Sequence, residues 1–114
     1  MKLFSTNTYY VPKDLNSITQ SKNEVLPKQG GMTEQQVQKI WGSIESLYRT
    51  GNHPLISVCL RRKGEIILNR SLGYASGNSA SGLAQNAVIA NPDTPICLFS
   101  ASKMITAMLI HMLD

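Results

Sequence analysis

Two side chains near the end of the chain have the types and the spacing to carry out acyl transfer. Ser100 and Lys103 form a Ser-x-x-Lys motif, the only match of this form in the 114-residue chain. A serine hydroxyl is a competent nucleophile only when a base takes its proton. A lysine amine can serve as that base when dry, apolar surroundings favour its neutral form. We expect the apolar neighbours of the motif to supply such surroundings: Leu98, Phe99, Met104 and Ile105.

Ser100 stands at the start of a predicted helix that runs on to Asp114. The first amides of a helix are unpaired and its dipole is positive there, so a developing anion is stabilised. Lys103 follows one turn later on the same face. An alternative interpretation is a serine N-cap with a surface lysine in the first turn. On the motif alone the two interpretations weigh about equally.

The predicted last helix is apolar around nearly its whole circumference. A helix of this kind belongs inside a large protein, because every face needs cover. The rest of the chain offers one amphipathic helix and one hairpin, too few elements to cover it. We therefore expect the chain to be a truncated part of a larger domain. The apolar residues are Met104, Ile105, Ala107, Met108, Leu109, Ile110, Met112 and Leu113.

An amphipathic helix is predicted from about Glu34 to Arg49. Thr33 and Gln36 have the spacing of a capping box, which satisfies two free amides at the helix start. Gly51 can adopt the left-handed conformation that ends a helix. The apolar stripe at helical spacing indicates a core-facing side and comprises Val37, Ile40, Trp41, Ile44, Leu47 and Tyr48.

An antiparallel hairpin is predicted next, with strands at Leu55 to Leu60 and Glu65 to Leu72. Lys63 and Gly64 supply the tight turn between them. From Gly73 to about Pro95 the chain is rich in Ser, Gly, Asn and Ala, and we predict a long loop. Residues 1–32 are predicted to be an irregular leader, because they carry prolines, a Gly-Gly pair and no sustained period.

The segment from Asn91 to Ala107 resembles the serine region of the β-lactamase-related family. That family includes class C β-lactamases, D-alanyl-D-alanine carboxypeptidases and family VIII esterases, and Thr94 to Lys103 is close to its approach to the active-site helix. The order of elements also agrees: a helix, a hairpin, a turn like Gly73-Tyr74-Ala75, a loop and the serine helix. The resemblance covers about residues 33–114.

This resemblance implies an α/β (α+β) fold, with residues 33–114 as the N-terminal part of a β-lactamase/transpeptidase-like domain. It implies that Ser100 is the acylated nucleophile, with its backbone amide as one oxyanion donor, and that Lys103 activates it. In the family a Tyr-x-Asn motif and a Lys-Thr-Gly-like strand follow the serine helix, which places them beyond Asp114. We therefore expect the missing C-terminal part of the same domain to be needed, and these 114 residues alone to be inactive.

The expected function is a serine hydrolase that acts on small esters or amides through an acyl-serine intermediate. No apolar signal segment follows Met1, so a cytoplasmic, esterase-like member is expected. A β-lactamase or a D-Ala-D-Ala carboxypeptidase is an alternative. A non-catalytic binding protein with the same fold is an alternative of a different class.

Other functions find little support in the composition. The net charge is +4, but the densest basic cluster, Arg61 to Lys63, fits a solvated hairpin tip better than a nucleic-acid surface. The stretch from Met104 to Leu113 is too short to span a bilayer.

The potential metal ligands are also few. Cys59 and Cys97 lack metal-type spacing and are predicted to be buried free thiols. His53 and His111 are expected to be structural or solvated. We expect no metal and no cofactor.

Overall fold

The computed structural model describes residues 8–113, and its fold is α+β, as predicted. Residues 1–7 of the predicted leader and the final Asp114 lie outside this range. Two helices accompany a four-stranded antiparallel sheet in which β1, β3 and β2 are neighbours and β4 pairs with the end of β3. The elements are β1 (Thr19–Ser21), α1 (Glu34–Tyr48), β2 (Leu55–Arg62), β3 (Glu65–Ser79), β4 (Gly82–Ile89) and α2 (Ser102–Leu113), with short 3-10 turns at Leu15–Ile18, Pro27–Gly30 and Phe99–Ala101.

The start and the end of α1 confirm the sequence prediction. The amide of Gln36 donates to Thr33 Oγ1 at 3.1 Å, and the amide of Thr33 donates to Gln36 Oε1 at 3.0 Å. Both halves of the capping box are therefore present. Gly51 has φ +74°, the left-handed conformation expected of a residue that stops a helix.

The hairpin of β2 and β3 is also confirmed. Lys63 and Gly64 both have positive φ, at 53° and 79°, which is typical of the type I′ turn that matches the twist of two strands. The register pairs Leu55 with Gly73 and Leu60 with Leu68, and it shifts by a bulge at the next residue. Arg61, Arg62 and Lys63 are exposed at this tip, as the solvated interpretation predicts.

The long loop predicted between Gly73 and Pro95 is wrong for most of its length. There β3 continues to Ser79, and β4 returns beside it in a second hairpin. Gly, Ser and Asn are poor strand formers, so local propensity gives no sign of this pairing. The side chain of Asn78 is buried and makes two hydrogen bonds with the backbone of Tyr10. These bonds attach the end of β3 to the N-terminal segment.

The leader contributes more to the domain than an irregular segment would. Leu15 and Ile18 are each only 2% exposed and belong to the main core cluster. The short strand β1 follows at once and pairs Thr19 with Leu72. Burial of these two side chains by tertiary contact, rather than any local period, gives this segment its structure.

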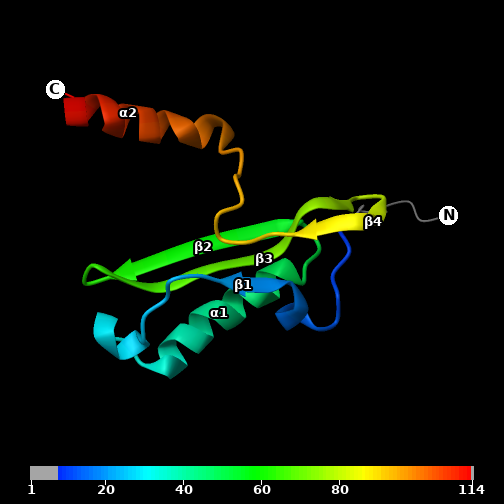
Figure 1. The fold of residues 1–114 in the computed structure, drawn as a ribbon, viewed down its shortest axis with the longest axis horizontal. Helices are drawn as coiled ribbons and strands as arrows, with labels where there is room; N and C mark the ends of the chain where they lie inside the picture. Colours follow the sequence, from blue (N-terminus) through cyan, green and yellow to red (C-terminus); the bar gives the residue numbers. More distant parts are fainter. Residues whose placement is uncertain (1–7, 114) are drawn as a thin grey trace.

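The core lies between the sheet and α1, which covers one face of it (Figure 1). One cluster joins the leader to the middle of the sheet and the C-terminal half of α1, and a second joins the N-terminal half of α1 to the start of β3. The first comprises Leu15, Ile18, Trp41, Tyr48, Leu72 and Tyr74, and the second Val37, Ile67 and Leu68.

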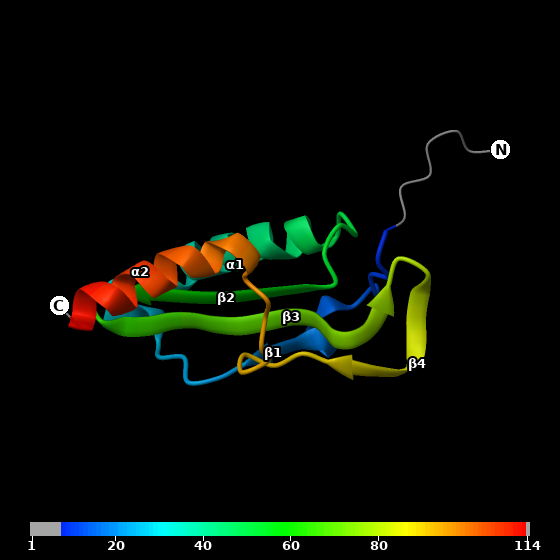
Figure 2. The same ribbon diagram turned by 90° about the horizontal axis from the view of Figure 1, so that it is seen from above.

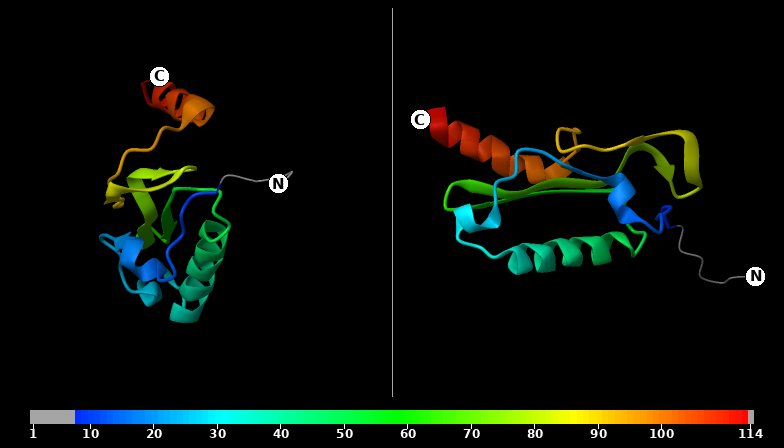
Figure 3. Two further views of the ribbon diagram at one scale, coloured as in Figure 1. Left: turned by 90° about the vertical axis from the view of Figure 1, so that its right-hand side faces the viewer. Right: turned by 60° about the horizontal axis from the view of Figure 1, so that its bottom comes forward.

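Helix α2 stands apart from residues 8–90, which we call the body. It lies on the side of the sheet opposite α1, at the end of an extended segment that leaves β4 (Figures 1 and 3). In Figure 2, seen from above, the two helices overlap in projection, and Figure 1 shows that the sheet lies between them. Every residue from Ser102 to Leu113 is exposed. The pattern that is apolar on all sides is therefore present, but within residues 8–113 nothing buries it.

Candidate functional site

Ser100 lies in a 3-10 turn, Phe99–Ala101, directly before α2. The predicted helix start is therefore two residues early. The amide of Ala101 donates to the carbonyl of Leu98 at 3.0 Å, and Ser102 Oγ donates to the carbonyl of Phe99 at 2.7 Å. The Ser102 hydroxyl thus bonds back to a carbonyl and does not accept a helix amide, and Leu98, the N-cap of this 3-10 turn, makes no side-chain cap.

The motif spacing places Ser100 and Lys103 one turn apart, and both side chains are exposed. The side-chain hydrogen bonds of this turn come from Ser102 and from Thr106, whose Oγ1 donates to the carbonyl of Ser102 at 3.1 Å. Local folding therefore brings the two predicted site residues to one end of one helix. Their access to solvent suits a group that must meet a substrate.

The residue before Ser100 has an unusual backbone conformation. Phe99 has φ +49°, although it is not glycine, and its side chain is 82% exposed. A bulky residue in the left-handed region costs about 1–2 kcal/mol. Strain of this kind is often found next to functional groups. It turns the chain so that Ser100 stands at the corner between the extended segment and α2.

The dry environment predicted for the motif is absent from this structure. Its four apolar neighbours are 46% to 82% exposed: Leu98, Phe99, Met104 and Ile105. The reason is tertiary, because α2 packs against no covering element in the described chain. The arrangement thus supplies a nucleophile and an amine, but not the desolvation that would favour a neutral lysine.

The segment that leads to this turn is anchored at a buried residue, Ala90. Ala90 is fully buried at the end of β4, and its amide donates to the carbonyl of Gly73 at 3.0 Å. The buried hydroxyl of Ser71 donates to the carbonyl of Ala90 at 3.1 Å. From Asn91 onward the chain leaves the sheet, and we call residues 91–98 the arm. The arm is the only covalent connection between the body and the Ser100 turn.

The prediction that both cysteines are buried is wrong. Cys59 and Cys97 are exposed free thiols. Side chains alternate along β2, so Val58 and Leu60 pack toward the core and Cys59 points to the other face of the sheet. Cys97 lies in the arm. His53 and His111 are exposed, which agrees with a solvated role.

Two hollows lie away from the motif. One of about 320 Å³ lies at the β3–β4 turn, with Asn78 and Ser81 in its lining, and one of about 260 Å³ lies beside α1 and Arg70. Within residues 8–113 no three His, Cys, Asp or Glu side chains lie close enough together to hold a metal ion. No helix in the same range is long and apolar enough to cross a bilayer.

Perturbed titratable groups are found in the core. Burial raises the pKa of Tyr48 to about 12, and the neighbouring Tyr74 adds to the shift. Burial also raises the pKa of Tyr74. Tyr48 donates a hydrogen bond to the carbonyl of Pro54 at 3.3 Å, which gives the buried hydroxyl a structural role.

Comparison of the chain with protein-family models, with curated proteins and with solved structures found no match. The resemblance to the β-lactamase-related family therefore rests on the motif and its flanking segment. The turn expected at Gly73-Tyr74-Ala75 is wrong, because these residues lie inside β3. Ser100 and Lys103 remain the candidate site.

Proposed function

We propose that Ser100 is the nucleophile and Lys103 the activating base of a serine hydrolase that acts on small esters or amides. The observation that carries the proposal is the position of both residues in one exposed turn at the N-terminal end of α2. The strained φ of Phe99 and the free side chain of Ser100 support it. In the proposed active state α2 is enclosed by further protein, because its apolar faces need cover.

The proposed reaction is acyl transfer in two steps. Lys103 Nζ takes the proton of Ser100 Oγ while the oxygen attacks the substrate carbonyl carbon, and the amides at the helix start stabilise the oxyanion. The intermediate collapses, the leaving alcohol or amine takes that proton, and an acyl-serine remains. Water then attacks the acyl carbon while Lys103 Nζ takes its proton, the bond from the acyl carbon to Ser100 Oγ breaks, and the proton passes to Oγ as the acid leaves.

Enclosure of α2 is what would make Lys103 a base. A lysine ammonium surrounded by water stays charged and cannot accept a proton. Packing other chain over Phe99 and Met104 would remove that water from the lysine. We therefore expect the 114-residue chain alone to show no turnover above that of its Ser100→Ala variant.

The test has two parts. The coding sequence is read past Asp114, and the encoded polypeptide is assayed with small chromogenic esters and probed with a fluorophosphonate. A downstream Tyr-x-Asn-like motif followed by a Lys- or His-x-Gly strand is expected. Ser100→Ala should abolish labelling and lower kcat by roughly 10³-fold or more. Ser57→Ala, at an exposed serine on β2, is the matched control and should keep both.

The test can also contradict the proposal. A chain that stops at Asp114, or labelling that persists in Ser100→Ala, would rule it out. A panel containing a cephalosporin and a D-Ala-D-Ala peptide separates the esterase from the β-lactamase and the carboxypeptidase.

A non-catalytic binding role is the second candidate, and the exposure of the motif's apolar neighbours favours it. In that case α2 contacts a partner through its apolar residues, and Ser100 needs no activation. Replacing Ser100 would then leave function intact, whereas replacing Met108 or Leu109 with charged residues would abolish it.

A further inference from the structure

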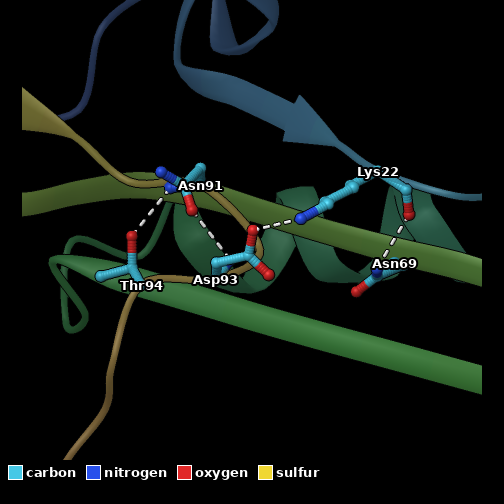
Figure 4. A network of polar contacts seen from close by, with 5 residues as sticks. All are labelled: Lys22, Asn69, Asn91, Asp93 and Thr94. Atoms are coloured by element: carbon cyan, nitrogen blue, oxygen red, sulfur yellow. Dashed lines mark hydrogen bonds and ion pairs between the residues drawn. The ribbon is translucent and has the colours of Figure 1, made fainter.

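The beginning of the arm carries a polar network that joins it to the segment after β1 (Figure 4). Lys22 Nζ and Asp93 Oδ2 form an ion pair at 2.5 Å. The two residues are 71 positions apart in sequence. The pair is thus a tertiary contact between the segment after β1 and the beginning of the arm.

The backbone of Lys22 is hydrogen-bonded to β3. The amide of Lys22 donates to the carbonyl of Asn69 at 3.1 Å, and Asn69 Nδ2 donates to the carbonyl of Lys22 at 2.8 Å. Lys22 is therefore fixed to β3 through its backbone. An exposed ion pair is weak because water and salt screen it and because two mobile side chains lose freedom. Fixation of the Lys22 backbone leaves only the side chains to be ordered.

Asp93 belongs to a tight turn with its own hydrogen bonds. Its amide donates to Asn91 Oδ1 at 2.8 Å, an Asx-type contact. The amide of Asn91 donates to Thr94 Oγ1 at 2.9 Å, and the amide of Thr94 donates to the carbonyl of Asn91 at 3.0 Å. The turn from Asn91 to Thr94 is therefore a closed unit, and the ion pair fixes its orientation on the sheet.

Two prolines restrict the backbone in and directly after this turn. Pro92 fixes φ inside the turn, and Pro95 fixes φ directly after it and restricts Thr94 to extended backbone. Beyond Thr94 the next backbone contact of the arm is local, between Ala101 and Leu98. The direction in which the arm leaves the sheet is thus set at the turn.

We propose that the Lys22–Asp93 pair is an electrostatic latch that sets the direction of the arm and of α2. With the latch closed, the turn has one orientation and α2 occupies the side of the sheet opposite α1 (Figure 1). With the latch open, Ala90 remains buried but the turn rotates about it, and α2 samples many directions. The proposal goes beyond the hydrolase chemistry and does not depend on it.

The two exposed cysteines supply a direct test. Cys59 lies on β2 and Cys97 on the arm, so nitroxide labels at both report the orientation of the arm by pulsed EPR. Asp93→Asn and Lys22→Gln should each broaden the distance distribution by about twofold or more. Lys28→Gln, at another exposed lysine, is the matched control and should leave it unchanged. The double variant Lys22→Asp with Asp93→Lys should restore the narrow distribution.

Ionic strength gives an independent check. At 1 M salt the screening length falls to about 3 Å, so the wild-type distribution should widen toward that of Asp93→Asn. An Asp93→Asn distribution as narrow as the wild type, or a charge swap that fails to restore it, would overturn the latch. Circular dichroism of each variant establishes that the body is folded.

Discussion

Residues 8–90 and residues 91–113 contain similar apolar side chains, but these side chains differ in burial. In the first region α1 turns one apolar stripe to the sheet, and Tyr48, Leu68 and Leu72 are fully buried. In the second, α2 is apolar around nearly its whole circumference, and residues such as Met108 and Met112 are 64% and 78% exposed. Apolar composition alone therefore does not create a core, because burial requires a partner surface of matching shape.

Backbone anchoring differs in the same way. The body is joined by three strand pairings, whereas the arm is attached at Ala90 and at one ion pair. The same kind of substitution should therefore lower the free energy of unfolding much more at a buried position than at an exposed one. Three such comparisons and one pH dependence follow.

Two glycines with the same backbone conformation should give the largest difference. Gly73 and Gly82 both have φ +122°, but a Cβ at Gly73 would collide with the carbonyl of Pro54 and approach Tyr48 Cε2 to 2.9 Å, whereas Gly82 has open space. Gly73→Ala should lower the free energy of unfolding by about 2–6 kcal/mol, and Gly82→Ala by about 1–2 kcal/mol. Urea unfolding measures both. Equal losses would mean that backbone strain at positive φ, and not the clash of the added Cβ, determines the loss of stability.

A leucine pair compares the body with α2 directly. Leu68 is fully buried and Leu109 is 54% exposed. Leu68→Ala should lower the free energy of unfolding by about 2–5 kcal/mol, because it removes packed methyl groups and leaves a cavity. Leu109→Ala should change it by less than about 0.5 kcal/mol. A loss above about 1 kcal/mol in Leu109→Ala would show that α2 is packed in solution.

The buried tyrosine predicts a loss of stability in alkali. The pKa of Tyr48 is 10.0 when unperturbed and about 12 in the folded chain, so the unfolded state loses its proton first. Stability from the neutral buried phenol is complete below pH 10 and declines as the pH rises toward 12. The decline should reach about 2 kcal/mol.

Urea unfolding at several pH values, with phenolate absorbance as a second signal, measures this effect. Tyr48→Phe should be less stable at neutral pH but should lose less over this alkaline interval. The same alkaline slope in both proteins would assign the effect to other groups, and Tyr74 would be the next candidate.

The smallest difference is expected between two hydroxyls at helix starts. Thr33→Ala removes the capping bond of α1, which is coupled to the core, and should cost about 1 kcal/mol. Ser102→Ala removes the bond to the carbonyl of Phe99 at the start of α2 and should change global stability by less than about 0.5 kcal/mol. Thermal unfolding followed by circular dichroism measures both, and a reversed order would contradict the division into body and arm.

Local signals predicted those parts of the fold that local chemistry controls. Thr33 with Gln36, and Lys63 with Gly64, satisfy the backbone within a few residues, so their structures follow from sequence. The extension of β3 to Ser79 and the burial of Leu15 depend on partners tens of residues away, so propensity missed them. The motif of Ser100 and Lys103 was likewise local, but its exposure was not.

By itself the sequence determined the amphipathic helix, the first hairpin and the pattern of α2 that is apolar around nearly its whole circumference. These depend on contacts across three or four residues and on backbone preferences of single residues. Only the tertiary structure decided that the leader completes the core, that both cysteines face solvent and that Lys22 reaches Asp93. Those outcomes depend on which surfaces meet, and the free energy of burial and of ion pairing arises only where distant segments come together.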